Sequence, residues 1–252
     1  MEATTQKTDY ENKTIGQLVS EDFARAGVFK KFGIDFCCGG NKSARKACEE
    51  KGIDFDALRL ELEAAENKKD NAPSHNFNQW DLGFLADYIV NQHHKYIKEN
   101  TPVIMEYAKK VAKVHGHANP EVIEISRLFT ELSNELQMHM MKEEGILFPY
   151  IKQLAEAHKE NREAPTPPFM TVQNPVRMME AEHDIAGELM KKIQKLSNAY
   201  TPPDHACNTY RVEYFKLEEY ENDLFQHIHL ENNILFPKAI AMEKAMQKKE
   251  GV

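Results

Sequence analysis

The chain has 252 residues, 41% of them hydrophobic and 29% charged, with a net charge of -8. This composition is typical of a globular protein rather than a disordered one. A nucleic-acid partner would need concentrated Lys and Arg, and the sequence contains no basic stripe, so we expect none. No stretch approaches the roughly 20 apolar residues of a membrane span, and residues 1–13 show no apolar run typical of a secretory signal. Four cysteines, two of them adjacent, do not make a disulfide framework. We therefore expect a cytoplasmic protein without a membrane partner.

Residues 13–66 predict a small helical domain. Apolar residues at helical spacing begin at Thr14 and stop at Gly33, and shorter helices are expected over residues 43–51 and 55–66. Between them, Cys37 and Cys38 precede a Gly-Gly pair. A nearby helix N-terminus would favour their thiolate forms, so we interpret them as redox or iron-transfer thiols. The alternative is a pair of small buried thiols in a tight turn. A polar linker follows over residues 67–78.

Residues 79–248 predict four long helices, over residues 79–114, 121–159, 175–198 and 206–244. Connections rich in Gly and Pro separate them, and Asp204 is the predicted N-cap of the last helix. No run shows the alternation of a strand, so the fold class is all-α. Four helices with short connections favour an up-down-up-down four-helix bundle, preceded here by the small N-terminal domain.

One motif, His-x3-Glu-x2-Ile-Leu-Phe-Pro, occurs twice. It begins at His139 and again at His227, with its glutamates at Glu143 and Glu231. A residue four places on stands about 40° round an α-helix, so each His and Glu leave the same face. Apolar residues flank both pairs, which indicates that they face the interior. Because neither residue type belongs unpaired in a core, we predict a metal site. Imidazole nitrogens with carboxylate oxygens suit iron, manganese or zinc.

The other two helices should each add a histidine. The third contains only His183, and the small Ala186 and Gly187 on its face would leave room for a metal. The first contains His93 and His94, and periodicity alone does not decide between them. On the same helical wheel His229 lies nearly opposite His227, so we expect it to face solvent.

Taken together, these motifs resemble the hemerythrin-like di-iron proteins for repair of iron centres, of the ScdA/YtfE type. The segment from Gly33 to Gly40 looks like the short N-terminal domain of that family, and residues 139–149, 182–188 and 227–237 look like its metal motifs. The resemblance implies His94 rather than His93. It implies two non-haem irons in an oxo- and carboxylate-bridged centre. The implied ligands are His94, His139, Glu143, His183, His227 and Glu231, with the two glutamates bridging.

The resemblance also implies a function, the repair of iron–sulfur clusters damaged by nitrosative or oxidative stress. The implied partners are damaged iron–sulfur proteins, with NO or O2 as small ligands. Two alternatives stay open: a di-iron enzyme that reduces NO or peroxide, and a module that binds or senses O2 or NO. The N-terminal thiols favour an iron-donating repair protein over a turnover enzyme or a gas carrier, and no catalytic residue is assigned. A homodimer is compatible with the sequence, which does not determine the oligomeric state.

Overall fold

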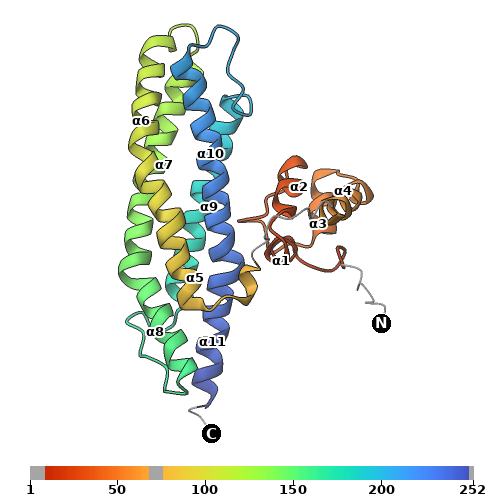
Figure 1. Ribbon diagram of the computed structural model, residues 1–252, viewed down its shortest axis with the longest axis vertical. Helices are drawn as coiled ribbons and strands as arrows, with labels where there is room; N and C mark the ends of the chain where they lie inside the picture. Colours follow the sequence, from red (N-terminus) through yellow and green to blue (C-terminus); the bar gives the residue numbers. More distant parts are fainter. Residues whose placement is uncertain (1–8, 68–75, 250–252) are drawn as a thin grey trace. The chain divides into compact units, whose positions relative to one another are not determined.

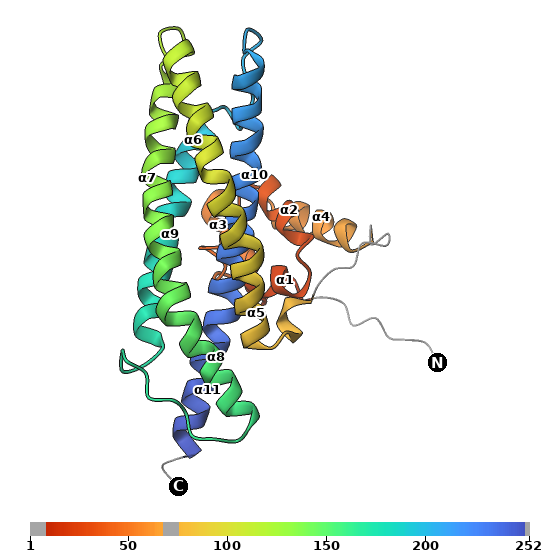
Figure 2. The same cartoon turned by 60° about the vertical axis from the view of Figure 1, so that its left-hand side comes forward.

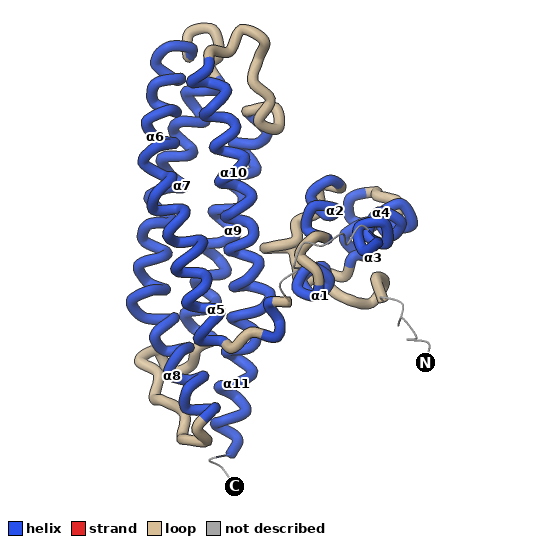
Figure 3. The backbone as a smooth tube through the Cα atoms, viewed as in Figure 1, coloured by secondary structure: helices blue, strands red, loops and turns tan. Residues whose placement is uncertain are grey.

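The computed structural model describes residues 9–67 and 76–249. Its contacts divide the chain into two compact units. The first consists of Met1–Trp80 together with His229–Ile234, and the second of Asp81–Ile228 with Leu235–Val252. Within the described residues the regular structure is helical, and the only β pairing is an isolated bridge between Thr14 and Ser43 (Figure 3). The all-α prediction is confirmed. Most of the predicted linker over residues 67–78 lies outside the described residues.

The N-terminal part of the first unit contains four short helices and a 3-10 turn. They are α1 (Ile15–Glu21), α2 (Arg25–Lys31), α3 (Ala44–Lys51), α4 (Phe55–Asn67) and η1 (Phe77–Gln79). The apolar run after Thr14 therefore forms two helices rather than one, because the backbone is extended at Asp22 (φ -153°). Ser43 caps α3 by accepting a hydrogen bond from the backbone N–H of Lys46, and Gly52 ends it in a left-handed conformation (φ 65°).

The bundle consists of four continuous helical runs, as predicted (Figures 1 and 2). The first contains α5 (Leu82–Ile89), η2 (Val90–His94) and α6 (Lys95–His115). The second contains α7 (Glu121–Lys142), η3 (Glu143–Leu147) and α8 (Phe148–Lys159). The third is α9 (Gln173–Leu196), and the fourth contains α10 (Asn208–Leu230), η4 (Glu231–Leu235) and α11 (Phe236–Lys249). Helix α7 packs against both α6 and α9. None of the described helices is long and apolar enough to cross a membrane.

Three helix starts in the bundle differ from the sequence prediction, and the third run begins at Gln173 rather than at residue 175. The first run begins at Leu82 rather than at residue 79, because Asp81 accepts hydrogen bonds from the backbone N–H groups of Gly83 and Phe84. The predicted N-cap at Asp204 is wrong. The chain is still in a turn there, with the N–H of Ala206 bonded to the carbonyl of Pro203, and α10 begins only at Asn208.

Three of the runs contain one π-helical turn, at η2, η3 and η4. Proline follows closely in two of them, at Pro149 and Pro237. A proline ring clashes with the carbonyl four residues earlier and donates no hydrogen bond, so the preceding turn widens. No proline lies in the turn after η2, so this account covers η3 and η4 only. Such turns often occur at functional sites, and here each one includes a predicted metal ligand.

Candidate metal centre

The six predicted ligands come together in the bundle from all four runs. His94 ends η2, His139 lies in α7, His183 in α9 and His227 in α10, while Glu143 and Glu231 begin η3 and η4. None of the six is more than 2% exposed. They form two overlapping groups whose ligand atoms lie within 4.8 Å of one another. One group contains His94 and His227, the other His139 and His183, and both contain the two glutamates. This arrangement offers two neighbouring cation positions that share two carboxylates.

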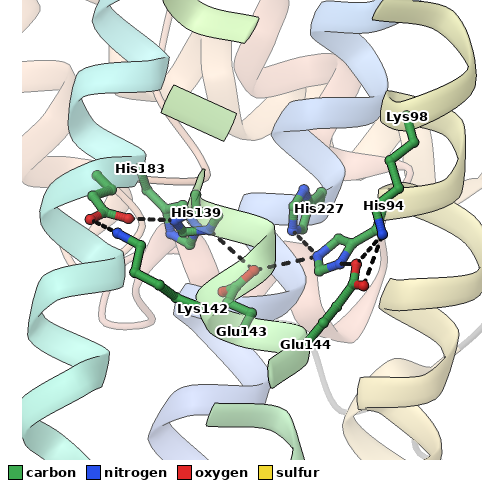
Figure 4. A network of polar contacts seen from close by, with 9 residues as sticks. His94, Lys98, His139, Lys142, Glu143, Glu144, His183 and His227 are labelled. Atoms are coloured by element: carbon green, nitrogen blue, oxygen red, sulfur yellow. Dashed lines mark hydrogen bonds and ion pairs between the residues drawn. The ribbon is translucent and has the colours of Figure 1, made fainter. Parts of the chain in front are cut away.

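The imidazole rings converge through their Nε2 atoms (Figure 4). The Nε2 atoms of His94 and His227 lie 3.2 Å apart, and those of His139 and His183 lie 3.0 Å apart. One oxygen of Glu143, Oε2, stands 3.4 Å from Nε2 of His94 and 3.2 Å from Nε2 of His139. That oxygen therefore faces a histidine of each group, so this carboxylate could be shared by cations held at the two groups.

Two further carboxylates orient the histidines from outside. Nδ1 of His94 donates to Glu144 (2.8 Å), which also accepts from Lys98, and Nδ1 of His139 donates to Glu182 (2.9 Å), which also pairs with Lys142. The hydrogen bond from His139 lowers the pKa of Glu182 to about 2, against the effect of burial and with help from Lys142. Burial works to raise the pKa of Glu144, but the hydrogen bonds from Lys98 and His94 lower it overall. Ionised carboxylates at Nδ1 fix the tautomer that leaves Nε2 available to a metal.

The donor set suits a metal of the iron, manganese and zinc group, because it combines imidazole nitrogens with carboxylate oxygens. Two carboxylates at 0% exposure would be costly to bury without compensating positive charge. Bound cations would supply that charge, so the residues present fit a metal centre.

The structure also separates the two adjacent histidines of the first run. His93 is 1% exposed, but its Nδ1 bonds to Asp223 (3.0 Å), and its ring stacks on His227 with centroids 5.9 Å apart. It belongs to neither ligand group, whereas His94 belongs to one.

We therefore expect His94→Ala to lose most of the bound metal, because it removes a donor atom, and His93→Ala to keep most of it. The measurement is metal per folded chain, with circular dichroism to confirm that both variants are helical. Loss in His93→Ala with retention in His94→Ala would reverse the assignment.

Cys37 and Cys38 lie in the turn between α2 and α3, Cys37 buried and Cys38 half-buried. The pKa of the Cys37 thiol is raised well above its ordinary value, first by the hydrogen bond to Cys38 and then by burial and the charge of Asp35. The expectation that a helix N-terminus favours thiolate here is therefore wrong for Cys37. Helix α3 begins at Ala44, too far along the chain to act on it, because this effect fades within the first turn.

The expectation that His229 faces solvent is also wrong. It is 0% exposed, its Nε2 lies 3.4 Å from the hydroxyl of Ser20, and the rings of Phe23 and Phe36 pack beside it. All four residues belong to the first unit. Burial lowers the pKa of His229 to about 4, so its imidazole is neutral at neutral pH.

The helical runs and the buried His/Glu cluster define a bundle of the hemerythrin class. Residues 85–239 match the family described as hemerythrin HHE cation binding domain, and residues 11–66 match ScdA_N, a domain of unknown function (DUF542). The chain is 33% identical over 235 residues to the iron-sulfur cluster repair protein YtfE of Yersinia pseudotuberculosis serotype IB (strain PB1/+), covering 93% of this chain and 100% of the relative. The YtfE protein of Yersinia pestis (strain Pestoides F) matches equally, at 33% identity over the same shares. The chain therefore belongs to the YtfE family of hemerythrin-domain proteins, and the family resemblance is confirmed.

Proposed function

We propose that this protein repairs iron–sulfur clusters damaged by nitrosative or oxidative stress, and that it does so by supplying iron from a di-iron centre. The observation that carries the proposal is the pair of overlapping ligand groups that share Glu143 and Glu231. The activity is the one named for the relatives, which align with the chain over 93% of its length.

In this proposal His94 and His227 would hold one iron, His139 and His183 would hold the other, and the two glutamates would be shared between them. Each iron would then have four protein donors, which would leave coordination positions for small ligands such as NO or O2. When bound, the two irons would be the metal that is transferred to the client, and they would supply redox chemistry. The protein's own part is to orient the rings through Glu144 and Glu182 and to keep the donor atoms buried.

The charge of the ligand set supports donation rather than storage. Two ferrous ions carry four positive charges, and the two bridging glutamates return only two negative ones. The outer carboxylates of Glu144 and Glu182 are paired with Lys98 and Lys142, respectively. They therefore offset little of the remaining positive charge of the irons. Ferritin-like sites use more carboxylates. A buried centre with residual positive charge holds its cations less tightly, which favours release to a client.

Cys37 and Cys38 are the proposed thiols through which iron or electrons pass to that client, a damaged iron–sulfur protein. Thiols in this role must stay reduced, and the cytoplasm keeps them so. The proposal therefore places the protein in the cytoplasm.

The test uses an iron–sulfur dehydratase that has lost one iron from its [4Fe–4S] cluster after peroxide treatment. The iron-loaded protein should restore dehydratase activity in the presence of an Fe2+ chelator and a thiol reductant. The metal-free protein should not, and neither should an equal amount of Fe2+ without protein, because the chelator captures it.

Two other outcomes would contradict the proposal. Many turnovers of NO per chain, with electrons consumed in proportion and no reactivation, would make the protein an NO-reducing enzyme. Reversible O2 binding without oxidation of the irons, again with no reactivation, would make it a gas-binding module.

A further inference from the structure

A second cluster of metal-ligating side chains lies in the first unit. Ligand atoms of Asp35, Cys37 and Cys38 all lie within 4.8 Å of one another. The Sγ atoms of the two cysteines are 3.9 Å apart, and Sγ of Cys37 is 3.2 Å from Oδ1 of Asp35. A disulfide would need an S–S distance of about 2.05 Å, so the two sulfurs are not bonded to each other.

These separations are close to those around one tetrahedral cation. Metal–sulfur bonds of about 2.3 Å at the tetrahedral angle place two sulfurs roughly 3.8 Å apart. With a metal–oxygen bond of about 2.1 Å, sulfur and oxygen come to roughly 3.6 Å. The observed 3.9 Å and 3.2 Å differ from these values by a few tenths of an ångström, which small side-chain rotations can supply.

The backbone of this turn is held in place before any cation arrives. Oδ1 of Asp35 accepts hydrogen bonds from the N–H groups of Cys37, Cys38 and Gly39, at 3.0–3.2 Å. Nδ2 of Asn233, also part of the first unit, donates to the carbonyl of Cys37 (3.1 Å). A Cβ at Gly40 would come within 2.8 Å of the backbone carbonyl oxygen of Phe36, so this close approach requires glycine. A held turn loses little conformational freedom on binding a ligand.

We propose that Asp35, Cys37 and Cys38 form a second, mononuclear site for a borderline-soft divalent cation, Fe2+ or Zn2+. Binding replaces the two thiol protons, which pass to solvent, with one doubly charged ion. Two thiolates suit such a cation better than they suit Mg2+ or Ca2+. Three protein donors leave the fourth position open, as in catalytic rather than structural zinc sites. Where the cation is Fe2+, the site would receive iron on its way to a client, a role that rests on the proposed function.

The experiment adds Co2+, as a spectroscopic probe, to the iron-loaded full-length protein. We expect about one Co2+ to bind per chain, with a thiolate-to-cobalt charge-transfer band in the near ultraviolet. The bundle cluster contains no cysteine, so Co2+ bound there would not give this band. Titration with Zn2+ and, under anaerobic conditions, with Fe2+ should abolish the band, and the concentrations required rank the two cations. Absence of the band in the wild-type protein would overturn the proposal.

Variants test the ligand set. Cys37→Ser with Cys38→Ser should remove the band while the bundle keeps its iron. Asp35→Asn retains an oxygen that can accept the three N–H groups but loses the charge, so Co2+ should bind at least about tenfold more weakly. The matched controls are Cys48→Ser and Cys207→Ser, which replace a buried cysteine of α3 and an exposed cysteine. Both should leave the band unchanged. A band that survives the double substitution, or affinity unchanged in Asp35→Asn, would overturn the assignment. Cobalt binding is measured independently of cluster repair, so a protein with the band but no repair activity contradicts the proposed function only.

Discussion

Replacing Glu143 with glutamine should lower the iron content from about two per chain to well below one, and lower the melting temperature with it. One Glu143 oxygen lies within 3.4 Å of a histidine in each ligand group. In the proposed di-iron centre, the substitution therefore replaces a shared carboxylate by a neutral amide and removes an anion from between the two cations. Glutamine has nearly the same shape, so the loss reports on charge rather than on packing. The measurements are iron per folded chain and thermal unfolding of the protein as purified.

The matched control is Glu156→Gln, which removes an exposed carboxylate from α8 in the same helical run. It should keep the iron and the melting temperature of the wild-type protein. Glu231→Gln should behave as Glu143→Gln does, because Glu231 is the other residue common to the two groups. If Glu143→Gln kept both irons, the bridging role would be wrong.

The positions of four of the six residues could be predicted because the motif is repeated. Two His-x3-Glu turns at the same register place His and Glu on one helix face whatever the tertiary structure, and the structure brings both pairs together. The choice between His93 and His94 could not be made from periodicity. Both histidines are buried, so burial does not separate them, and a π-helical turn at η2 changes the angular spacing there.

The outer carboxylates were missed because they act across the bundle. Glu144 bonds to His94 and Glu182 to His139, pairs that are 50 and 43 residues apart in the sequence. On a helical wheel with 3.6 residues per turn, Glu144 points away from the interior of the bundle. The π-helical turn that begins at Glu143 rotates by fewer degrees per residue, so the wheel misplaces Glu144. The available signal was local: each carboxylate is the sequence neighbour of a predicted ligand, Glu143 or His183.

The error at His229 has a different cause. The wheel describes how side chains are directed around one helix and says nothing about what covers the outer face. Ser20, a partner of His229, lies 209 residues earlier, beyond the reach of any helical periodicity. The sequence predicted a small helical domain over residues 13–66, but not that residues 229–234 would belong to the same compact unit.

Glu213 is one of the buried carboxylates that lie outside the metal centre. Glu213 lies in α10, fourteen residues before His227, or about 21 Å along the helix. It is 0% exposed, and neither of its carboxylate oxygens has a hydrogen-bond partner. Burial raises its pKa from 4.5 to about 8, so at neutral pH the folded protein holds Glu213 mainly in its protonated form.

This shift has a definite sign for stability. Below about pH 4.5 the carboxyl is protonated in both the folded and the unfolded chain, so its titration has no effect on stability. Between the unfolded and folded pKa values the unfolded chain releases the proton while the folded chain keeps it. The free energy of unfolding then falls as pH rises, by about 1.4 kcal/mol per pH unit at most. Above about pH 8 the cost stays constant, and we expect it to be on the order of 5 kcal/mol.

Glu213→Gln should therefore be more stable than the wild-type protein at alkaline pH, with an advantage that grows between pH 5 and pH 8. About 5 kcal/mol corresponds to a melting temperature roughly 10–20 °C higher in a domain of this size. The measurement is thermal unfolding of both proteins across this range at equal iron content, so that the pH dependence of metal binding cancels in the difference.

Glu218→Gln, which removes an exposed carboxylate from the same helix, should show no such trend. Glutamine leaves its amide as poorly partnered as the protonated acid, so the absolute difference at low pH carries little information and the slope with pH is the decisive quantity. A difference between wild-type protein and Glu213→Gln that stays flat from pH 5 to pH 8 would mean that Glu213 is ionised in the folded protein.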